Sequence, residues 1–188
     1  MDFLNSIILL TNFIIVPGIT YGSQLALGAI GVTLIYGVLR FANFAYGDLM
    51  AFGTMIVILV TWFLQSKGIT FGLLPTALLA LPVGILLTIA VSLFFDKTVF
   101  EYYRNKKSDP VTFIVVSLGI MFVLNAVVRI IIGPNDINFM DGHKFIMKAR
   151  EFKKMTGLNE GLALESTQVI TLITTIITCS ILFYFLNK

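Results

Sequence analysis

Long apolar stretches with almost no charged side chains dominate the sequence. A spanning helix needs about 20 mostly apolar residues to cross a hydrocarbon layer about 30 Å thick. Stretches close to this length occupy residues 18–39, 49–64, 71–95, 111–132 and 169–186. In lipid, only helices and closed barrels satisfy the backbone hydrogen bonds, and these runs lack the alternation of barrel strands. The sequence therefore predicts an all-α integral membrane protein, a polytopic bundle of about five spanning helices.

The first apolar run is longer than the others. Residues 3–39 contain no Asp, Glu, Lys or Arg. This run is too long for one spanning helix and marginal for two. Pro17-Gly18 divides the run in our interpretation. Residues 3–16 are then an apolar lead-in, and residues 18–39 form the first full span. A cleaved signal peptide is disfavoured, because the start carries Asp2 and no Lys or Arg.

Composition excludes several classes of protein. Of the 188 residues, 57% are apolar and 12% are charged, about half the usual share of charged residues. A soluble domain, a disordered chain and a nucleic-acid binder all need more polar surface. A single cysteine, Cys179, and a single histidine, His143, argue against a disulfide framework, a metal site and a catalytic triad. We therefore predict no enzyme, and no catalytic, cofactor-binding or metal-binding residue.

The distribution of Lys and Arg predicts the orientation in the membrane. A basic segment, residues 96–110, should be a cytoplasmic loop, and it includes Glu101 and Arg104. Residues 134–168 then form an extracytoplasmic loop, although they are also rich in basic residues. Within that loop, the spacing of apolar side chains over residues 143–155 is compatible with a short amphipathic helix. A solvated charged loop is the alternative.

Small residues follow one face of the first span. Steps of three and four residues along a helix keep side chains on one face, and small side chains let helices approach closely in lipid. We interpret this face as a packing surface inside a bundle rather than as a substrate groove. Its members are Gly18, Gly22, Ala26, Ala29 and Gly37.

The connection after this span is the most informative stretch. Helix-forming residues give way to Arg40, Asn43, Gly47 and Asp48, yet aromatic residues keep the connection apolar. Asp48 stands where a helix beginning at Leu49 would have its N-cap. Two interpretations remain open. The stretch is either a broken segment beside a transport path or a capped turn at the membrane interface.

The same stretch resembles a known family. Asn43-Phe44-Ala45-Tyr46-Gly47-Asp48, preceded by Gly31-Val32-Thr33-Leu34-Ile35-Tyr36-Gly37, is similar to the permease subunits of branched-chain amino acid ABC importers. Tyr46 replaces the histidine of the Asn-Phe-Ala-His-Gly-Asp motif. Glu101 and Arg104 lie where the family has a Glu and a basic cytoplasmic loop, but the proline of that loop is missing. The resemblance extends to Ser117-Leu118-Gly119-Ile120 and Leu124-Asn125.

The resemblance implies a function. The chain would be a single permease domain, residues 1–188, in a bacterial inner membrane, forming part of the path for branched-chain or related small amino acids. Under the first of the two interpretations of the connection, the residues of the broken segment at the translocation path are Asn43, Phe44, Tyr46, Gly47 and Asp48. Because the family's permeases are longer, we expect the chain to be their N-terminal part, incomplete at its C-terminus.

Partners follow from the same resemblance. The sequence contains no phosphate-binding Gly-x-x-x-x-Gly-Lys-Ser/Thr motif, so ATP would be used by separate cytoplasmic ATPase subunits. A second permease subunit, an extracytoplasmic substrate-binding protein and membrane lipid complete the expected partners, and no nucleic acid is expected. A self-contained secondary transporter or channel subunit is the alternative.

Overall fold

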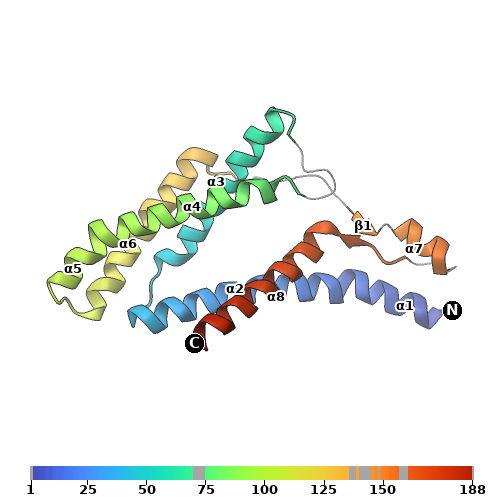
Figure 1. Cartoon of the computed structure of the whole chain (residues 1–188), viewed down its shortest axis with the longest axis horizontal. Helices are drawn as coiled ribbons and strands as arrows, with labels where there is room; N and C mark the ends of the chain where they lie inside the picture. The colour runs from blue at the N-terminus through green and yellow to red at the C-terminus, as the bar shows by residue number, and fades with distance from the viewer. Residues whose placement is uncertain are drawn as a thin grey trace. The chain divides into compact units, whose positions relative to one another are not determined.

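The computed structural model describes residues 2–69, 75–135, 139, 145–147, 149–156 and 161–187. Helices make up most of these residues (Figure 1). Two compact units divide the chain. The first unit comprises residues 1–30, 72–75 and 142–188, and the second comprises residues 31–71 and 76–141.

The N-terminal apolar run forms one continuous helix. It consists of α1 (Asp2–Leu10), a π-helical turn η1 (Thr11–Ile15) and α2 (Val16–Leu39). Our division of this run at Pro17-Gly18 is therefore wrong. Pro17 has no N–H, and its ring would clash with the carbonyl of residue 13 in a regular α-helix. The π-helical turn ends at Ile15, two residues before Pro17, and such a wider turn lets the helix continue past the proline.

The rest of the first unit contains a small hairpin-like pair of strands. β1 (Phe145–Met147) pairs antiparallel with β2 (Leu164–Glu165), and between them lies α7 (Ala149–Thr156). The predicted amphipathic helix over residues 143–155 is thus shorter, because residues 145–147 pair with β2 instead. His143 lies outside the described residues. α8 (Ser166–Leu186) follows β2 and begins with a capping box formed by Glu165 and Gln168.

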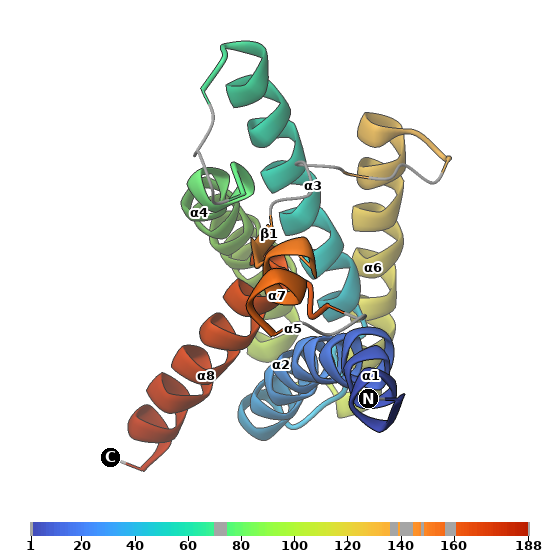
Figure 2. The ribbon, with the colours of Figure 1, turned by 90° about the vertical axis from the view of Figure 1, so that its right-hand side faces the viewer.

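The second unit is built on α3 (Ala45–Ser66), which lies between α4 (Ala77–Phe95) and α6 (Pro110–Ile132) (Figure 2). Two glycines allow α3 and α4 to approach closely. A Cβ atom on Gly84 would collide with Cγ2 of Val57, and one on Gly53 would lie 2.6 Å from Oγ1 of Thr88. In lipid, such close approach is a main source of helix association.

α4 does not end where the sequence predicts a loop. It continues through the π-helical turn η2 (Asp96–Phe100) into α5 (Glu101–Asn105). Glu101 and Arg104 therefore lie on a helix and not in a loop. No Gly or Pro interrupts residues 96–105, so the helix can continue to Asn105. Pro82 lies inside α4, whereas Pro75 precedes it.

Five helices in the described ranges are long and apolar enough to cross a membrane. The polytopic α-helical fold is therefore confirmed. Buried apolar side chains gather where α3, η2 and α6 meet, and most other large apolar side chains are exposed, as expected for surfaces that face lipid. The buried cluster consists of Phe41, Ala45, Phe100, Ile120 and Leu124.

Candidate functional site

The connection between α2 and α3 is non-helical and short. α2 ends at Leu39 and α3 begins at Ala45. Arg40 leaves the helix with a left-handed φ of 57°, and its N–H donates to the Tyr36 carbonyl at 2.8 Å. Phe41 then turns inward. Its ring centroid lies 5.8 Å from that of Phe100 and 5.2 Å from that of Phe113. The connection is thus anchored to the protein by an aromatic cluster.

Hydrogen bonds satisfy the backbone where the connection meets α3. The Asn43 side chain accepts from the Ala45 N–H at 3.1 Å. The Phe44 N–H donates to the hydroxyl of Ser117 at 3.2 Å, and that fully buried hydroxyl donates to the Ile114 carbonyl at 2.7 Å. Irregular backbone at membrane depth is tolerated where it is buried in protein or lines a cavity. The contacts satisfy the N–H groups of Phe44 and Ala45, and the connection also lines a pocket.

Asp48 does not cap a helix. Because α3 begins four residues earlier than predicted, Asp48 lies in its first turn and Asn43 supplies the local hydrogen bond instead. The Asp48 carboxylate accepts a hydrogen bond from the side-chain amide of Asn125, with 2.9 Å between Nδ2 and Oδ1. A carboxylate near a helix N-terminus is also favoured by the helix dipole. Asp48 therefore ties the start of α3 to α6.

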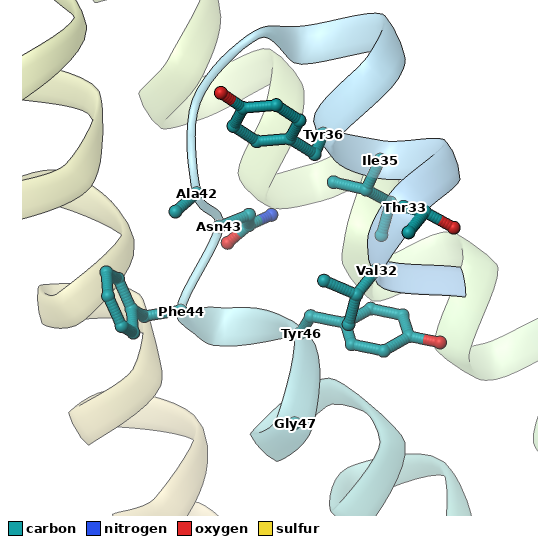
Figure 3. A pocket seen from close by; sticks show the side chains of 9 residues that line it. All are labelled: Val32, Thr33, Ile35, Tyr36, Ala42, Asn43, Phe44, Tyr46 and Gly47. Atoms are coloured by element: carbon teal, nitrogen blue, oxygen red, sulfur yellow. The ribbon is translucent and has the colours of Figure 1, made fainter. Parts of the chain in front are cut away.

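A pocket of about 510 Å³ opens beside the connection (Figure 3). The volume falls in the range of small-molecule sites, about 300–1,000 Å³. Its walls are mostly apolar, and the polar residues among them are Thr33, Tyr36, Asn43 and Tyr46. α2 supplies Val32, Thr33, Ile35 and Tyr36, and the connection with the start of α3 supplies Ala42, Asn43, Phe44, Tyr46 and Gly47. The pocket suits a small, partly apolar molecule.

Tyr46 forms part of this pocket through a close contact with α2. Its ring crosses toward α2, and a Cβ atom placed on Gly31 would collide with the Tyr46 hydroxyl. Gly31 is therefore required for Tyr46 to lie where it does. In the resembled motif a histidine stands at this position, so the larger phenol ring is a feature of this chain.

The predicted site residues separate into three groups. Asn43, Phe44, Tyr46 and Gly47 come together at the pocket, whereas Asp48 contacts Asn125. The small residues Gly18, Gly22, Ala26, Ala29 and Gly37 are all exposed, and their packing role stays a prediction. Glu101 and Arg104 lie at the far end of the α4 extension.

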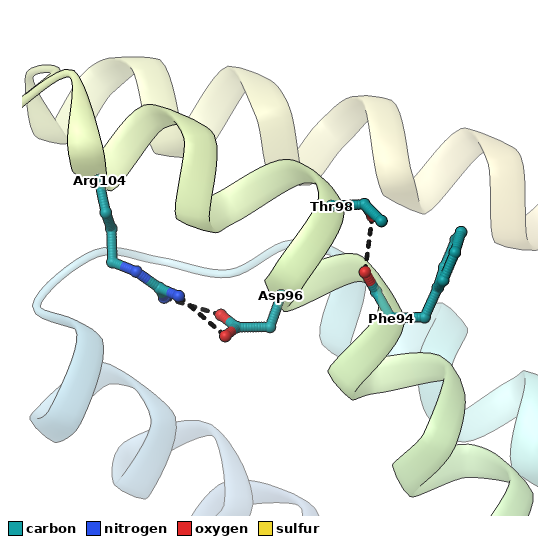
Figure 4. Close-up of polar contacts among 4 residues, drawn as sticks. All are labelled: Phe94, Asp96, Thr98 and Arg104. Carbon is teal, nitrogen blue, oxygen red and sulfur yellow. Dashed lines mark hydrogen bonds and ion pairs between the residues drawn. The ribbon is translucent and has the colours of Figure 1, made fainter.

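That far end is rich in charged side chains, with four basic and three acidic residues over positions 96–110. Arg104 forms a bidentate ion pair with Asp96, with N–O distances of 2.7 and 2.8 Å (Figure 4). Lys106, just after α5, lies with its ammonium 4.4 Å from the ring centroid of Tyr102. Hydrogen bonding to Tyr102 raises the pKa of Lys106, which keeps its positive charge.

Sequence reasoning missed several residues of the site. Ser117 appears in the motif of the resembled family, but nothing in the sequence pattern says that its hydroxyl receives the Phe44 N–H. The sequence predicts that Asp96 lies in a loop, whereas the structure places it on a helix. A helical spacing of eight residues between Asp96 and Arg104 would have placed them on one face, had the helix been predicted to continue.

The fold and the site define a polytopic helical membrane protein with a short non-helical connection beside an apolar pocket. Residues 14–188 match the family described as branched-chain amino acid transport system / permease component, and the chain belongs to that family. It is a multi-pass protein of the bacterial cytoplasmic membrane, in accord with its relatives and its five long apolar helices.

Curated relatives agree with the family. The chain is 30% identical over 121 residues to the high-affinity branched-chain amino acid transport system permease protein LivH of Escherichia coli K12, covering 64% of this chain and 38% of LivH. It is 38% identical over 55 residues to BraD of Pseudomonas aeruginosa, covering 29% of this chain and 18% of BraD. The chain thus spans well under half the length of these relatives. No solved structure matches it significantly.

Proposed function

We propose that this chain forms part of the translocation path of an ABC importer for branched-chain or related small amino acids. Separate ATPase subunits would supply the energy. A second permease subunit and an extracytoplasmic binding protein would complete the transporter. Both named relatives are permease proteins of high-affinity branched-chain amino acid transport systems, which supports this substrate class.

The pocket at the broken connection is the observation that carries the proposal. Its apolar walls match the aliphatic side chain of a branched-chain amino acid, and Asn43 offers an amide to a polar group of the substrate. The hydrogen bonds to Ser117 and within the Asn43 turn hold the pocket wall in place. A wall fixed in this way can present the same groups to each substrate molecule.

Uptake measurements test the energy source. The complex that co-purifies with the chain from native membranes is reconstituted into liposomes, and entry of radiolabelled leucine is followed with ATP or a non-hydrolysable analogue supplied to the ATPase side. We expect uptake with ATP alone and a co-purifying ATPase. Equal uptake with the analogue, or driven by an ion gradient, would favour the self-contained transporter or channel instead.

Cysteine protection tests the pocket. Ala42→Cys places a thiol on the pocket wall, in a Cys179→Ser background that removes the native cysteine. We expect leucine to slow its reaction with a hydrophilic thiol reagent. Lys67→Cys, at the exposed end of α3, serves as the control and should react equally with and without leucine. If leucine leaves the reaction rate of Ala42→Cys unchanged, as it does for Lys67→Cys, the pocket is not part of the translocation path.

A further inference from the structure

A second pocket, about 250 Å³ in volume, lies at the basic end of the second unit. The end of α2, the η2–α5 extension and the start of α6 surround it. Arg40, Arg104 and Ser108 contribute polar groups, and Leu39, Phe41 and Phe113 are among its apolar walls. We refer to this site as the basic interfacial pocket.

The two arginines of this pocket differ in whether an acidic side chain pairs with them. Asp96 also lines the pocket, and its bidentate pair with Arg104 neutralises that guanidinium. Arg40 is exposed, and its side chain has no acidic partner among the residues that the structure describes. The charged side chains that line the pocket are thus two arginines and one aspartate, which leaves one positive charge without a partner in the lining. An anion could balance that charge.

Backbone conformation adds a second observation. Among the described residues, Arg40 and Lys107 are the non-glycine residues with positive φ, at 57° and 52°. This left-handed conformation costs side chains other than glycine roughly 1 kcal/mol or more. Arg40 lines the basic interfacial pocket, and Lys107 directly precedes Ser108, which also lines it. At Arg40, a long cationic side chain therefore stands at the pocket in a position where glycine would be less strained.

We propose that the basic interfacial pocket binds the phosphate of an anionic phospholipid, such as phosphatidylglycerol, at the membrane surface. Arg40 would contact the phosphodiester and Ser108 would donate to it. Leu39 and Phe113 would contact the upper acyl chain. Basic pockets between membrane helices are known to hold anionic headgroups in this way. The positive-inside pattern places this end of the helices at the cytoplasmic leaflet.

Photolabelling tests the proposal without any transport measurement, so its outcome is separate from that of the proposed function. The chain is reconstituted in phosphatidylcholine vesicles containing phosphatidylglycerol with a photoreactive group near the headgroup. Labelled peptides are mapped by mass spectrometry. We expect labelling at residues 38–41 and 108–113, competed by unlabelled phosphatidylglycerol. A phosphatidylcholine probe that labels these peptides equally would overturn the proposal.

Two variants change the charge of the pocket in opposite directions. Arg40→Gly removes the guanidinium while glycine keeps the left-handed turn, so the fold is retained and labelling should fall about fivefold. Asp96→Asn frees Arg104 from its partner, so labelling should rise. Lys67→Gln, at the opposite end of α3, is the control and should change nothing.

Competition with inorganic phosphate shows whether the site binds a lipid or a free anion. Inorganic phosphate added to the vesicles should compete poorly, because it has no acyl chain to contact Leu39 and Phe113. If phosphate displaces the probe as well as unlabelled phosphatidylglycerol does, the site binds a free anion and the lipid assignment fails. It also fails if folded Arg40→Gly, verified by its circular dichroism, labels as strongly as the unchanged protein.

Discussion

Asn125 of α6 donates a hydrogen bond from Nδ2 to Oδ1 of Asp48 in the first turn of α3, across 2.9 Å. This contact joins residues 77 positions apart in the sequence. The donor is a neutral amide, and the acceptor is a carboxylate, so the hydrogen bond is charge-assisted. Together with the bond from Phe44 to Ser117, it fastens the broken connection to α6.

A double-mutant cycle measures this contact. We expect Asp48→Ala and Asn125→Ala each to destabilise the protein, with a coupling energy of about 1 kcal/mol, the size typical of hydrogen bonds between membrane helices. Unfolding in mixed micelles, followed by circular dichroism, gives the energies. Additive effects would mean that the two side chains do not interact.

Transport rates provide a second test of the role of Asp48. Asp48→Leu should reduce transport by the complete complex more than Lys67→Ala does, because Asp48 anchors the pocket wall and Lys67 lies at an exposed helix end. The comparison uses initial uptake rates at equal amounts of protein in the membrane. Equal rates for the two variants would reduce the connection to a plain turn.

Hydropathy was enough to predict the helices, because a span needs only length and apolar character. The ends of the helices were less predictable. Residues 96–109 are polar enough for a loop. Without Gly or Pro, however, the helix continues through η2 and α5 as far as Asn105. Likewise, Pro17 predicted a break, but a π-helical turn lets the helix pass it.

The change in composition between Arg40 and Asp48 left two interpretations open, a broken segment beside a transport path and a capped turn. Four of the five residues named there line the pocket, and their part in transport stays a prediction. Contacts between helices were not predictable, because hydropathy does not set how one helix is rotated against another. The pairing of Asp48 with Asn125 and the closeness of Gly53 to Thr88 both depend on that rotation.

The close approach of α3 and α4 gives a further prediction. Gly84→Leu should destabilise the protein by about 2 kcal/mol, since a side chain there collides with Val57 and crowds the Gly53 carbonyl. Gly119→Leu on α6 is the matched control, because space around that glycine is open. Unfolding in mixed micelles compares the two. Similar stabilities would show that α3 and α4 are packed less closely than described.

Asn12 holds two parts of the first unit together. Its side-chain amide donates to the Gly161 carbonyl at 2.8 Å, and its side-chain oxygen accepts from the Ala163 N–H at 3.1 Å. Asn12→Leu removes both bonds, and each contributes about 1 kcal/mol. We expect faster hydrogen exchange in β2, measured by mass spectrometry. Gln24→Leu, at an exposed position of α2, should leave exchange in β2 unchanged.

The orientation in the membrane is open to a direct labelling test. Single cysteines at Lys106 and Asn135, both exposed, are introduced in a Cys179→Ser background. The basic residues near Lys106 predict that this end of the helices is cytoplasmic, and α6 then carries the chain across the membrane to Asn135. In intact cells, a membrane-impermeant reagent should therefore label position 135 and not position 106. Permeabilised cells provide the control, because both positions should react there. Labelling of position 106 in intact cells would reverse the orientation and move the basic interfacial pocket to the outer leaflet.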